Sequence, residues 1–106
     1  MDIEQIREDL KDIRFYYSMK ETFEKGATKV KATATIKKVE KYNRVMENAP
    51  ARLYILYVSL YLENHSQTSL ADSWCYTREY IKDLNNKLCD YLLKELIKLD
   101  KEVENG

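Results

Sequence analysis

The near lack of helix-breaking residues is the feature that most constrains the fold of this chain. Only Gly26, Gly106 and Pro50 interrupt its 106 residues. Glycine and proline are the strongest local signals for turns, so a turn-rich β fold has too few of them here. The length favours one domain with a core of modest size. The sequence therefore predicts an all-α protein.

Residues 2–25 are predicted to form one long N-terminal helix that begins at Asp2 and ends at Gly26. Aspartate is a favourable N-cap, and glycine commonly ends a helix. Residues 26–34 lack an apolar period and are predicted to be a loop, before a second helix over roughly 34–47. Along the first helix, apolar residues at steps of three and four form a seam: Ile3, Ile6, Leu10, Ile13 and Tyr17.

This heptad seam requires a partner helix, which is either another helix of the same chain or a second copy. So long an amphipathic helix in so short a chain favours the second copy. We therefore expect the seam to be an association surface and the protein to be a homodimer.

Basic residues concentrate in the middle of the chain, although the whole chain carries 18 basic and 18 acidic residues. Residues 25–44, the basic band, hold seven basic residues against one acid. Lys37, Lys38 and Lys41 are candidate phosphate contacts, and a solvated helix face is the alternative. Residues 1–47 are thus predicted to be a helical association region that carries the basic band.

Residues 50–99 are predicted to form a C-terminal unit of three helices, followed by a frayed acidic tail over 100–106. Pro50 suits the first turn of a helix, where its missing N–H costs nothing. The helix that follows is apolar nearly all round and should be central. Its predicted buried stripe is Leu53, Leu56, Tyr57 and Leu60.

The segment 66–88 is the most informative about function, because it predicts a short helix over about 67–73, a tight turn and a longer helix. Ser66 or Thr68 can cap the short helix, and Thr77 can cap the longer one. Residues suited to fix the crossing of the two helices are Leu70, Ala71, Ile81 and Leu84. This pattern indicates a helix-turn-helix, whose second helix exposes polar side chains to the major groove. The predicted fold is a long N-terminal helix plus a three-helix unit containing this motif.

Residues 77–84, Thr-Arg-Glu-Tyr-Ile-Lys-Asp-Leu, resemble the signature Thr-Arg-Glu-Arg-Ile-Arg-Gln-Ile of region four in bacterial sigma factors. Tyr80 and Asp83 stand where that signature has arginine and glutamine. Over residues 36–97 the chain is similar to the small RinA/ArpU-type activators encoded by phages and prophages of Gram-positive bacteria. The resemblance implies a sequence-specific DNA-binding transcription regulator, a phage or prophage late-gene activator. Its implied partners are double-stranded DNA and host RNA polymerase.

The same resemblance implies that Arg78 and Glu79 read bases, and that Lys82 reads a base or a phosphate. Tyr80 is expected to point outward beside Arg78, and Tyr80 and Asp83 are secondary base contacts. Candidate contacts to the DNA backbone are Thr77, Ser66, Gln67 and Lys87.

Other functions remain open for the same residues. Arg78 and Lys82 are like-charged at i, i+4, which mildly destabilises a helix and favours DNA contact over a merely solvated face. The alternative function is a helical protein–protein interaction module, an adaptor or anti-activator, on a helix-turn-helix scaffold without DNA binding. It predicts that polar substitutions at Ile6 or Leu10 abolish activity, whereas reversing the charge of Lys82 does not. A purely structural coiled-coil dimer is a third possibility.

Several function classes lack support in the sequence. No apolar run approaches the roughly 20 residues needed to span a bilayer, and the acidic N-terminus is unlike a signal peptide. We expect a cytoplasmic protein in which Cys75 and Cys89 are reduced. The two cysteines and the one histidine match no zinc-site spacing, and no catalytic or nucleotide-binding motif is present. We therefore expect no metal, no cofactor and no enzymatic activity.

Overall fold

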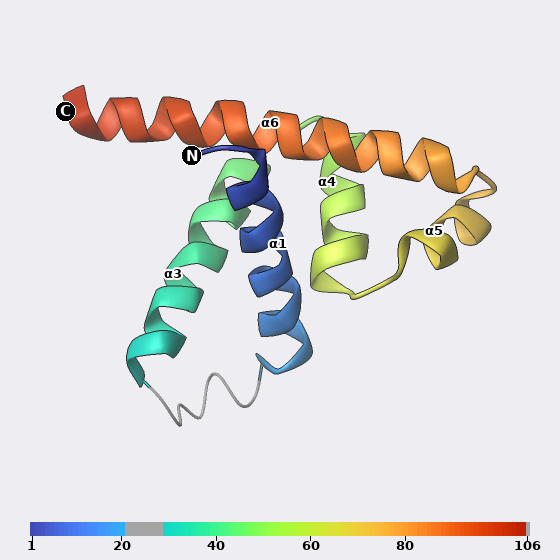
Figure 1. The fold of residues 1–106 in the computed structure, drawn as a ribbon, viewed down its shortest axis with the longest axis horizontal. Helices are drawn as coiled ribbons and strands as arrows, with labels where there is room; N and C mark the ends of the chain where they lie inside the picture. Colours follow the sequence, from blue (N-terminus) through green and yellow to red (C-terminus); the bar gives the residue numbers. More distant parts are fainter. Residues whose placement is uncertain (21–28, 106) are drawn as a thin grey trace.

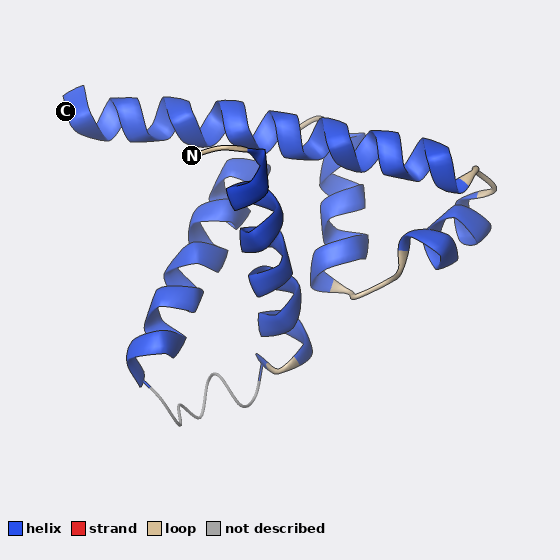
Figure 2. Ribbon diagram, viewed as in Figure 1, coloured by secondary structure: helices blue, strands red, loops and turns tan. Residues whose placement is uncertain are grey.

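The computed structural model describes residues 1–20 and 29–105, and within these ranges it contains helices and no strand. The all-α fold class is thereby confirmed. One long helix runs along an edge of the molecule, and the others lie beneath it (Figures 1 and 2). In chain order the helices are α1 (Ile3–Ser18), α3 (Lys29–Met46), α4 (Ala51–Tyr57), the π-helical turn η1 (Val58–Leu62), α5 (Gln67–Trp74) and α6 (Arg78–Asn105).

Helix α1 begins where the sequence predicts and ends earlier. The Asp2 carboxylate accepts a hydrogen bond of 2.9 Å from the backbone N–H of Gln5, which satisfies one of the free amides of the first turn. At the other end the Ser18 hydroxyl donates to the Phe15 carbonyl at 2.8 Å. This local bond competes with continuation of the helix, which stops at Met19. The predicted end at Gly26 lies outside the described residues.

Helix α3 begins earlier than predicted. Residues 29–33 were expected in a loop and are helical, so that expectation is wrong, whereas residues 26–28 lie outside the described ranges. Thr33 and Ala34 are exposed. The helix at Thr33 and Ala34 therefore needs no apolar period, and residues that tolerate a helix suffice because no glycine or proline interrupts them.

The predicted association seam lies inside the protein. Ile6, Leu10 and Ile13 are at most 1% exposed, and Ile3 and Tyr17 are partly buried against the same core. Helix α1 contacts α3, η1 and α6, so the partner of the seam is this chain itself. The prediction that these side chains face a second copy is therefore wrong, because folding has already removed them from water.

Both predicted regions contribute to one hydrophobic core. The N-terminal helices supply the seam and residues of α3, and the C-terminal helices supply most of the rest. The fully buried large side chains outside α1 are Tyr42, Met46, Leu56, Tyr57, Leu60, Ile81, Leu88, Leu92 and Leu96. Residues 1–47 therefore pack as part of the same folded unit as residues 50–99.

The central helix changes character halfway along. Helix α4 follows Pro50 and buries Leu56 and Tyr57 as predicted. It then widens into η1, where the Glu63 N–H donates to the Val58 carbonyl at 2.8 Å, a bond five residues back. Tyr54 and Ile55 are 45% and 52% exposed, so the helix is not buried all round as its composition suggested.

Helix α6 is longer than predicted. It continues to Asn105, so the predicted end at Leu99 is wrong. Residues 100–105 are helical and not a frayed tail, whereas residue 106 lies outside the described residues. No breaker occurs before Gly106, and the Lys41 ammonium of α3 pairs with the Asp100 carboxylate at 3.2 Å. A tertiary contact thus holds the segment that composition alone marks as loose. None of the helices in residues 1–20 and 29–105 has the length and apolar character required to cross a membrane.

A charged and polar network is buried between α1 and α3. The Asp9 carboxylate, 4% exposed, accepts from the Tyr42 hydroxyl at 2.6 Å and from the Gln5 amide at 2.9 Å. The Lys38 ammonium lies 3.2 Å from Asp9 and 2.7 Å from Asp12. Burial opposes the charge on Lys38, but hydrogen bonds to Asp12 and Asp9 prevail and raise its pKa. The network fixes the register of α1 on α3.

Buried tyrosines predict loss of stability at alkaline pH. Burial raises the pKa of Tyr61 from 10.0 to about 12, although its hydrogen bond to Asn85 opposes this, and burial also raises the pKa values of Tyr42 and Tyr57. A folded-state pKa above the unfolded value contributes stability that is complete below the unfolded pKa and is lost as pH rises toward the folded one. The free energy of unfolding should therefore be level to about pH 9 and fall by roughly 2 kcal/mol or more towards pH 12.

Urea unfolding at fixed pH values, with phenolate absorbance followed in parallel, tests this expectation. All nine tyrosines titrating near pH 10 in a protein that stays folded would contradict it.

Candidate nucleic-acid interface

Helix α5 is fixed at its start by a side-chain cap. The Ser66 hydroxyl accepts from the Ser69 N–H at 3.0 Å, so Ser66 and not Thr68 is the cap. Leu70 and Ala71 are buried at 4% and 1% exposure, as the sequence predicts. The small Ala71 side chain lies on the face of α5 that packs in the core, and α5 contacts α6 extensively. The short helix is thus held against α6 rather than free.

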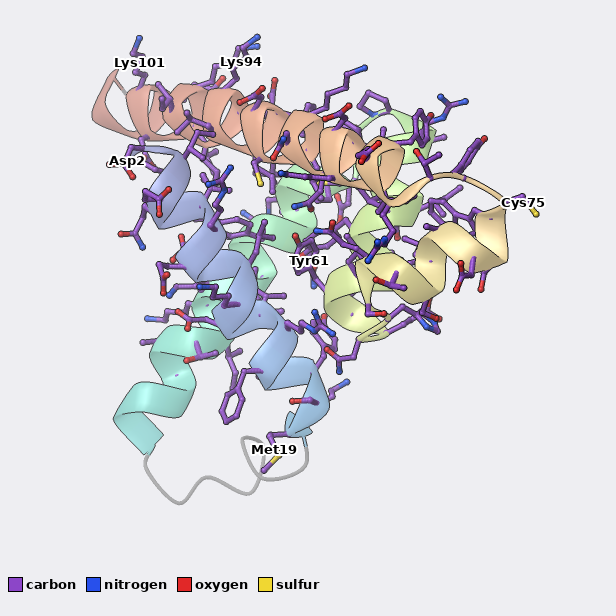
Figure 3. The ribbon with its side chains drawn as sticks, turned by 45° about the vertical axis from the view of Figure 1, so that its right-hand side comes forward. Asp2, Met19, Tyr61, Cys75, Lys94 and Lys101 are labelled. Atoms are coloured by element: carbon purple, nitrogen blue, oxygen red, sulfur yellow. The ribbon has the colours of Figure 1, made fainter. Side chains whose placement is uncertain are left out.

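The connection from α5 to α6 is a tight turn through a left-handed residue. Cys75 has φ 60° and ψ 38°, and the Tyr76 N–H donates to the Ala71 carbonyl at 2.9 Å. The Cys75 N–H adds a bond of 3.3 Å to the Asp72 carbonyl. These two bonds form a Schellman motif, which glycine normally ends. Cys75 lies at the tip of the molecule (Figure 3).

The left-handed conformation of Cys75 predicts a stabilising substitution. In the left-handed conformation, the Cβ of a residue other than glycine raises the free energy of the folded state by about 1–2 kcal/mol. Cys75→Gly should raise the free energy of unfolding by about 0.5–1 kcal/mol, after the greater flexibility of glycine in the unfolded chain is subtracted. Cys75→Ala is the matched control, because it removes the thiol and keeps the Cβ. Urea unfolding in which alanine stabilises as much as glycine would show that the thiol, and not the backbone, is responsible.

Helix α6 begins at a second side-chain cap. The Thr77 hydroxyl accepts from the Tyr80 N–H at 3.1 Å, which confirms the predicted cap. Ile81, Leu84 and Leu88 then face the core. Because Ile81, Leu84 and Leu88 are anchored in the core, the direction of the residues between them is fixed.

The predicted reading residues lie together on the first turns of α6. Arg78, Glu79, Lys82 and Asp83 are all exposed, and Lys87 follows one turn later. Among residues 1–20 and 29–105, none forms a hydrogen bond or ion pair with any of these five side chains. On other exposed helical surfaces, basic and acidic side chains pair with each other, as Arg7 does with Glu4 at 3.3 Å and Lys98 with Glu95 at 3.3 Å. The start of α6 therefore presents charged groups that the fold leaves unused.

Two predicted backbone contacts lie at the other end of α5. Ser66 is exposed and Gln67 is half-buried, both at the start of that helix. Thr77 is exposed next to the reading residues of α6. The structure thus places Thr77 with the cluster and places Ser66 and Gln67 about 12 Å along α5 from the turn, by the rise of eight helical residues.

Tyr80 does not point outward beside Arg78, so this prediction is wrong. Its hydroxyl accepts from the Arg52 guanidinium at 2.8 Å, and its ring lies 4.5 Å from that of Tyr76. Tyr80 is partly buried against the core. At four residues before Leu84 it lies on the flank of α6 that meets α4, which turns its ring inward. Tyr80 supports the start of α6 and is not placed to read a base.

Two of the three candidate phosphate contacts in the basic band form ion pairs within the protein. Lys38 pairs with the carboxylates of Asp9 and Asp12, and Lys41 pairs with that of Asp100. Neither ammonium is therefore free to contact phosphate, as the sequence had predicted it would. Lys37 is exposed, as predicted for a phosphate contact. Because Lys41 meets α6 at Asp100, it lies roughly 33 Å along that helix from Arg78. Lys41 is therefore remote from the reading residues.

A groove that the sequence did not predict lies between α4 and the connection to α6. It encloses about 680 Å³ and is lined by Ala51, Arg52, Ile55, Trp74, Tyr76 and Leu84. Ile55 and Tyr76 are 52% and 47% exposed. Leu84 is about 160° around the helix from Lys82 and about 100° from Asp83, so the groove and the reading residues lie on different sides of α6. The only sequence signal for it is the apolar excess of the segment around Ile55.

Within the described ranges, no group of three histidine, cysteine, aspartate or glutamate side chains is placed to hold a metal ion. The cluster at the start of α6 offers polar and charged side chains for contact with a ligand. It can donate from Arg78 and Lys82, accept at Glu79 and Asp83, and present Thr77 beside them. The chain matches no protein-family model, no curated protein and no solved structure.

Proposed function

We propose that this protein is a sequence-specific DNA-binding transcription regulator that reads base edges with the first turns of α6. The observation that carries the proposal is the cluster of exposed, unpaired charges at Arg78, Glu79, Lys82 and Asp83 on a helix that is rigidly capped. Helix α5, the tight connection and α6 support its assignment as a helix-turn-helix, in which such residues enter the major groove. The resemblance to phage and prophage late-gene activators supports the regulatory role.

The chemistry of the cluster suits a mixed sequence rather than a run of one base. Arginine pairs with the O6 and N7 acceptors of guanine, and carboxylates accept from the N4 amine of cytosine. Arg78 and Lys82 supply the former, and Glu79 and Asp83 supply the latter. Thr77, Ser66, Gln67 and Lys87 are proposed to contact the DNA backbone and set the register. The site should therefore contain G·C pairs.

Arg78→Ala tests this function directly. Loss of a bidentate guanine contact should weaken binding to the preferred duplex by about 1–3 kcal/mol, or roughly 5- to 150-fold, and relax sequence choice at one position. Selection from a randomised duplex library at low salt identifies the preferred sequence, and fluorescence anisotropy measures the affinity. Arg7→Ala on α1 is the matched control, because Arg7 is exposed and already paired with Glu4. Failure of the wild-type protein to enrich any sequence would overturn the proposal.

A homodimer on paired half-sites, in the cytoplasm and in contact with host RNA polymerase, completes the proposal. Two copies would double the reading surface of a chain whose net charge is zero. Since Ile6, Leu10 and Ile13 are buried, such a dimer must use another surface. Sedimentation of the protein alone and on the selected duplex would measure the number of copies.

The groove favours a second candidate function, a protein–protein interaction module without DNA binding. Exposed Ile55 and Tyr76 beside half-buried Trp74 form the kind of apolar surface that partner helices cover. Under this function Ile55→Ser would abolish activity, and reversing the charge of Lys82 would not. Substitutions at Ile6 or Leu10 cannot discriminate between the two functions, because those side chains belong to the core.

A further inference from the structure

Three lysines align along the outer face of α6 beyond the reading residues. Lys87, Lys94 and Lys101 are spaced by seven residues, which is nearly two helical turns, so they share one face and span roughly 21 Å. All three are exposed, and among residues 1–20 and 29–105 no carboxylate pairs with them. Lys94 and Lys101 point the same way, away from the rest of the protein (Figure 3). We call these three residues the lysine stripe.

The stripe is accessible along its whole length. The opposite face of the same segment carries Leu88, Leu92 and Leu96, which are fully buried. The helices α1, α3 and α4 lie on that buried side of α6 (Figure 1). A long, straight polyanion can therefore approach the stripe without meeting another part of the described structure.

The acids near the stripe leave it with a positive charge. Asp83 and Asp90 are exposed and lie four residues before Lys87 and Lys94, so together they reduce the charge of the stripe from +3 to +1. Glu95 pairs with Lys98 at 3.3 Å, and Asp100 pairs with Lys41 at 3.2 Å, so neither neutralises the stripe. The stripe is therefore a row of exposed ammonium groups on the same helix as the reading residues, with Asp83 and Asp90 beside it.

We propose that the lysine stripe binds the phosphate backbone of duplex DNA, so that α6 reads bases with its first turns and holds one strand with its outer face. This inference rests on the proposed function, because it takes the start of α6 to lie in the major groove. An α-helix with its side chains is 10–12 Å wide, and the groove is about 12 Å wide, so the flanks of the helix meet the bordering phosphates. Lys87 lies four residues after Asp83 and continues that flank away from the bases.

The stripe also replaces the predicted source of affinity. Lys38 and Lys41 of the basic band are engaged in ion pairs within the protein, and Lys41 belongs to α3 and pairs with Asp100 of α6. Phosphate neutralisation nevertheless has to supply much of the affinity for DNA. The stripe offers three ammonium groups that no internal carboxylate holds in the described structure.

The test compares the salt dependence of binding to a random-sequence duplex. Each phosphate contact contributes about 0.9 to the slope of log K against log salt. The triple variant Lys87→Gln, Lys94→Gln, Lys101→Gln should lower that slope by about 2–3 and weaken binding at least about tenfold at low salt, equally for every duplex. Asp90→Asn, which removes the repelling acid, should tighten binding severalfold. Fluorescence anisotropy over about 50–200 mM salt measures both effects.

The matched control is the triple variant Arg7→Gln, Lys11→Gln, Lys20→Gln, which changes the net charge equally but on α1 and at the residue that follows its C-cap, Met19. An unchanged slope in the stripe variant, an equal loss in the control, or no duplex binding by the wild-type protein would overturn the inference. If selection enriches no sequence but the stripe variant lowers the slope, base reading fails and the stripe stands. If selection enriches a sequence and the slope does not change, the stripe fails and base reading stands.

Discussion

Asp9→Ala is expected to destabilise the protein by about 3 kcal/mol, a large part of the 5–15 kcal/mol that holds a domain together. The substitution leaves the buried Tyr42 hydroxyl and the Lys38 ammonium without their shared acceptor. Removing one partner of a buried pair typically costs 3–5 kcal/mol, and the lower end applies because Lys38 keeps Asp12. Urea unfolding followed by circular dichroism measures the change.

Asp12→Asn is the matched control for this prediction. Asp12 pairs with the same ammonium at 2.7 Å, but its side chain is 53% exposed, so its loss should cost less than about 1 kcal/mol. Equal effects of the two substitutions would mean that burial of Asp9 adds nothing, and that the network is a surface ion pair in energetic terms.

Leu10→Ala is expected to cost about 2–5 kcal/mol, because it removes a side chain that is 1% exposed and leaves a cavity. Since Leu10 packs within its own chain, the difference between the denaturation midpoints of the variant and the wild-type protein should be the same at every protein concentration. Unfolding monitored over a wide concentration range tests this directly.

Lys11→Ala is the control beside it, because Lys11 is exposed and pairs only with Glu8 on the same helix. It should change stability by less than about 0.5 kcal/mol. If the denaturation midpoint rises with protein concentration in the wild-type protein but not in the Leu10 variant, the seam is instead an interface between two copies.

The parts of the fold that the sequence predicted correctly are local. Asp2, Ser66 and Thr77 cap their helices through bonds to amides three residues away, so the signal and its structural result lie in the same few residues. The buried stripe of α6 was equally visible, because a 3.6-residue period reports one face of one helix.

The parts that were missed depend on partners distant in sequence. A heptad seam indicates that Leu10 packs against another helix, but it does not indicate whether that helix is α3 or belongs to a second copy. From the sequence, Asp9 resembles any other surface acid, because its hydrogen-bond partner Tyr42 lies 33 residues later in the chain. Tyr80 and Lys38 were assigned outward roles for the same reason, since only the fold brings Arg52 and Asp12 to them.

The candidate site shows both situations at once. The position of Arg78, Glu79 and Lys82 on the exposed first turns of α6 followed from the Thr77 cap and the apolar period. The groove lined by Ile55 and Trp74 could not be predicted, because it requires α4 and the connection to be placed side by side. The groove and the reading residues lie on different sides of α6, and Tyr76 of the groove is two residues before Arg78.

The central claim, that α6 reads DNA with its first turns, is tested most directly by mapping the contact on the whole protein. Backbone amide signals are recorded by nuclear magnetic resonance as the selected duplex is added. We expect the largest shifts within residues 77–87, smaller ones at the start of α5 and at Lys94 and Lys101, and none on the buried faces of α1 and α3. Shifts confined to α3 or to the groove around Ile55, or no shifts at all, would contradict it.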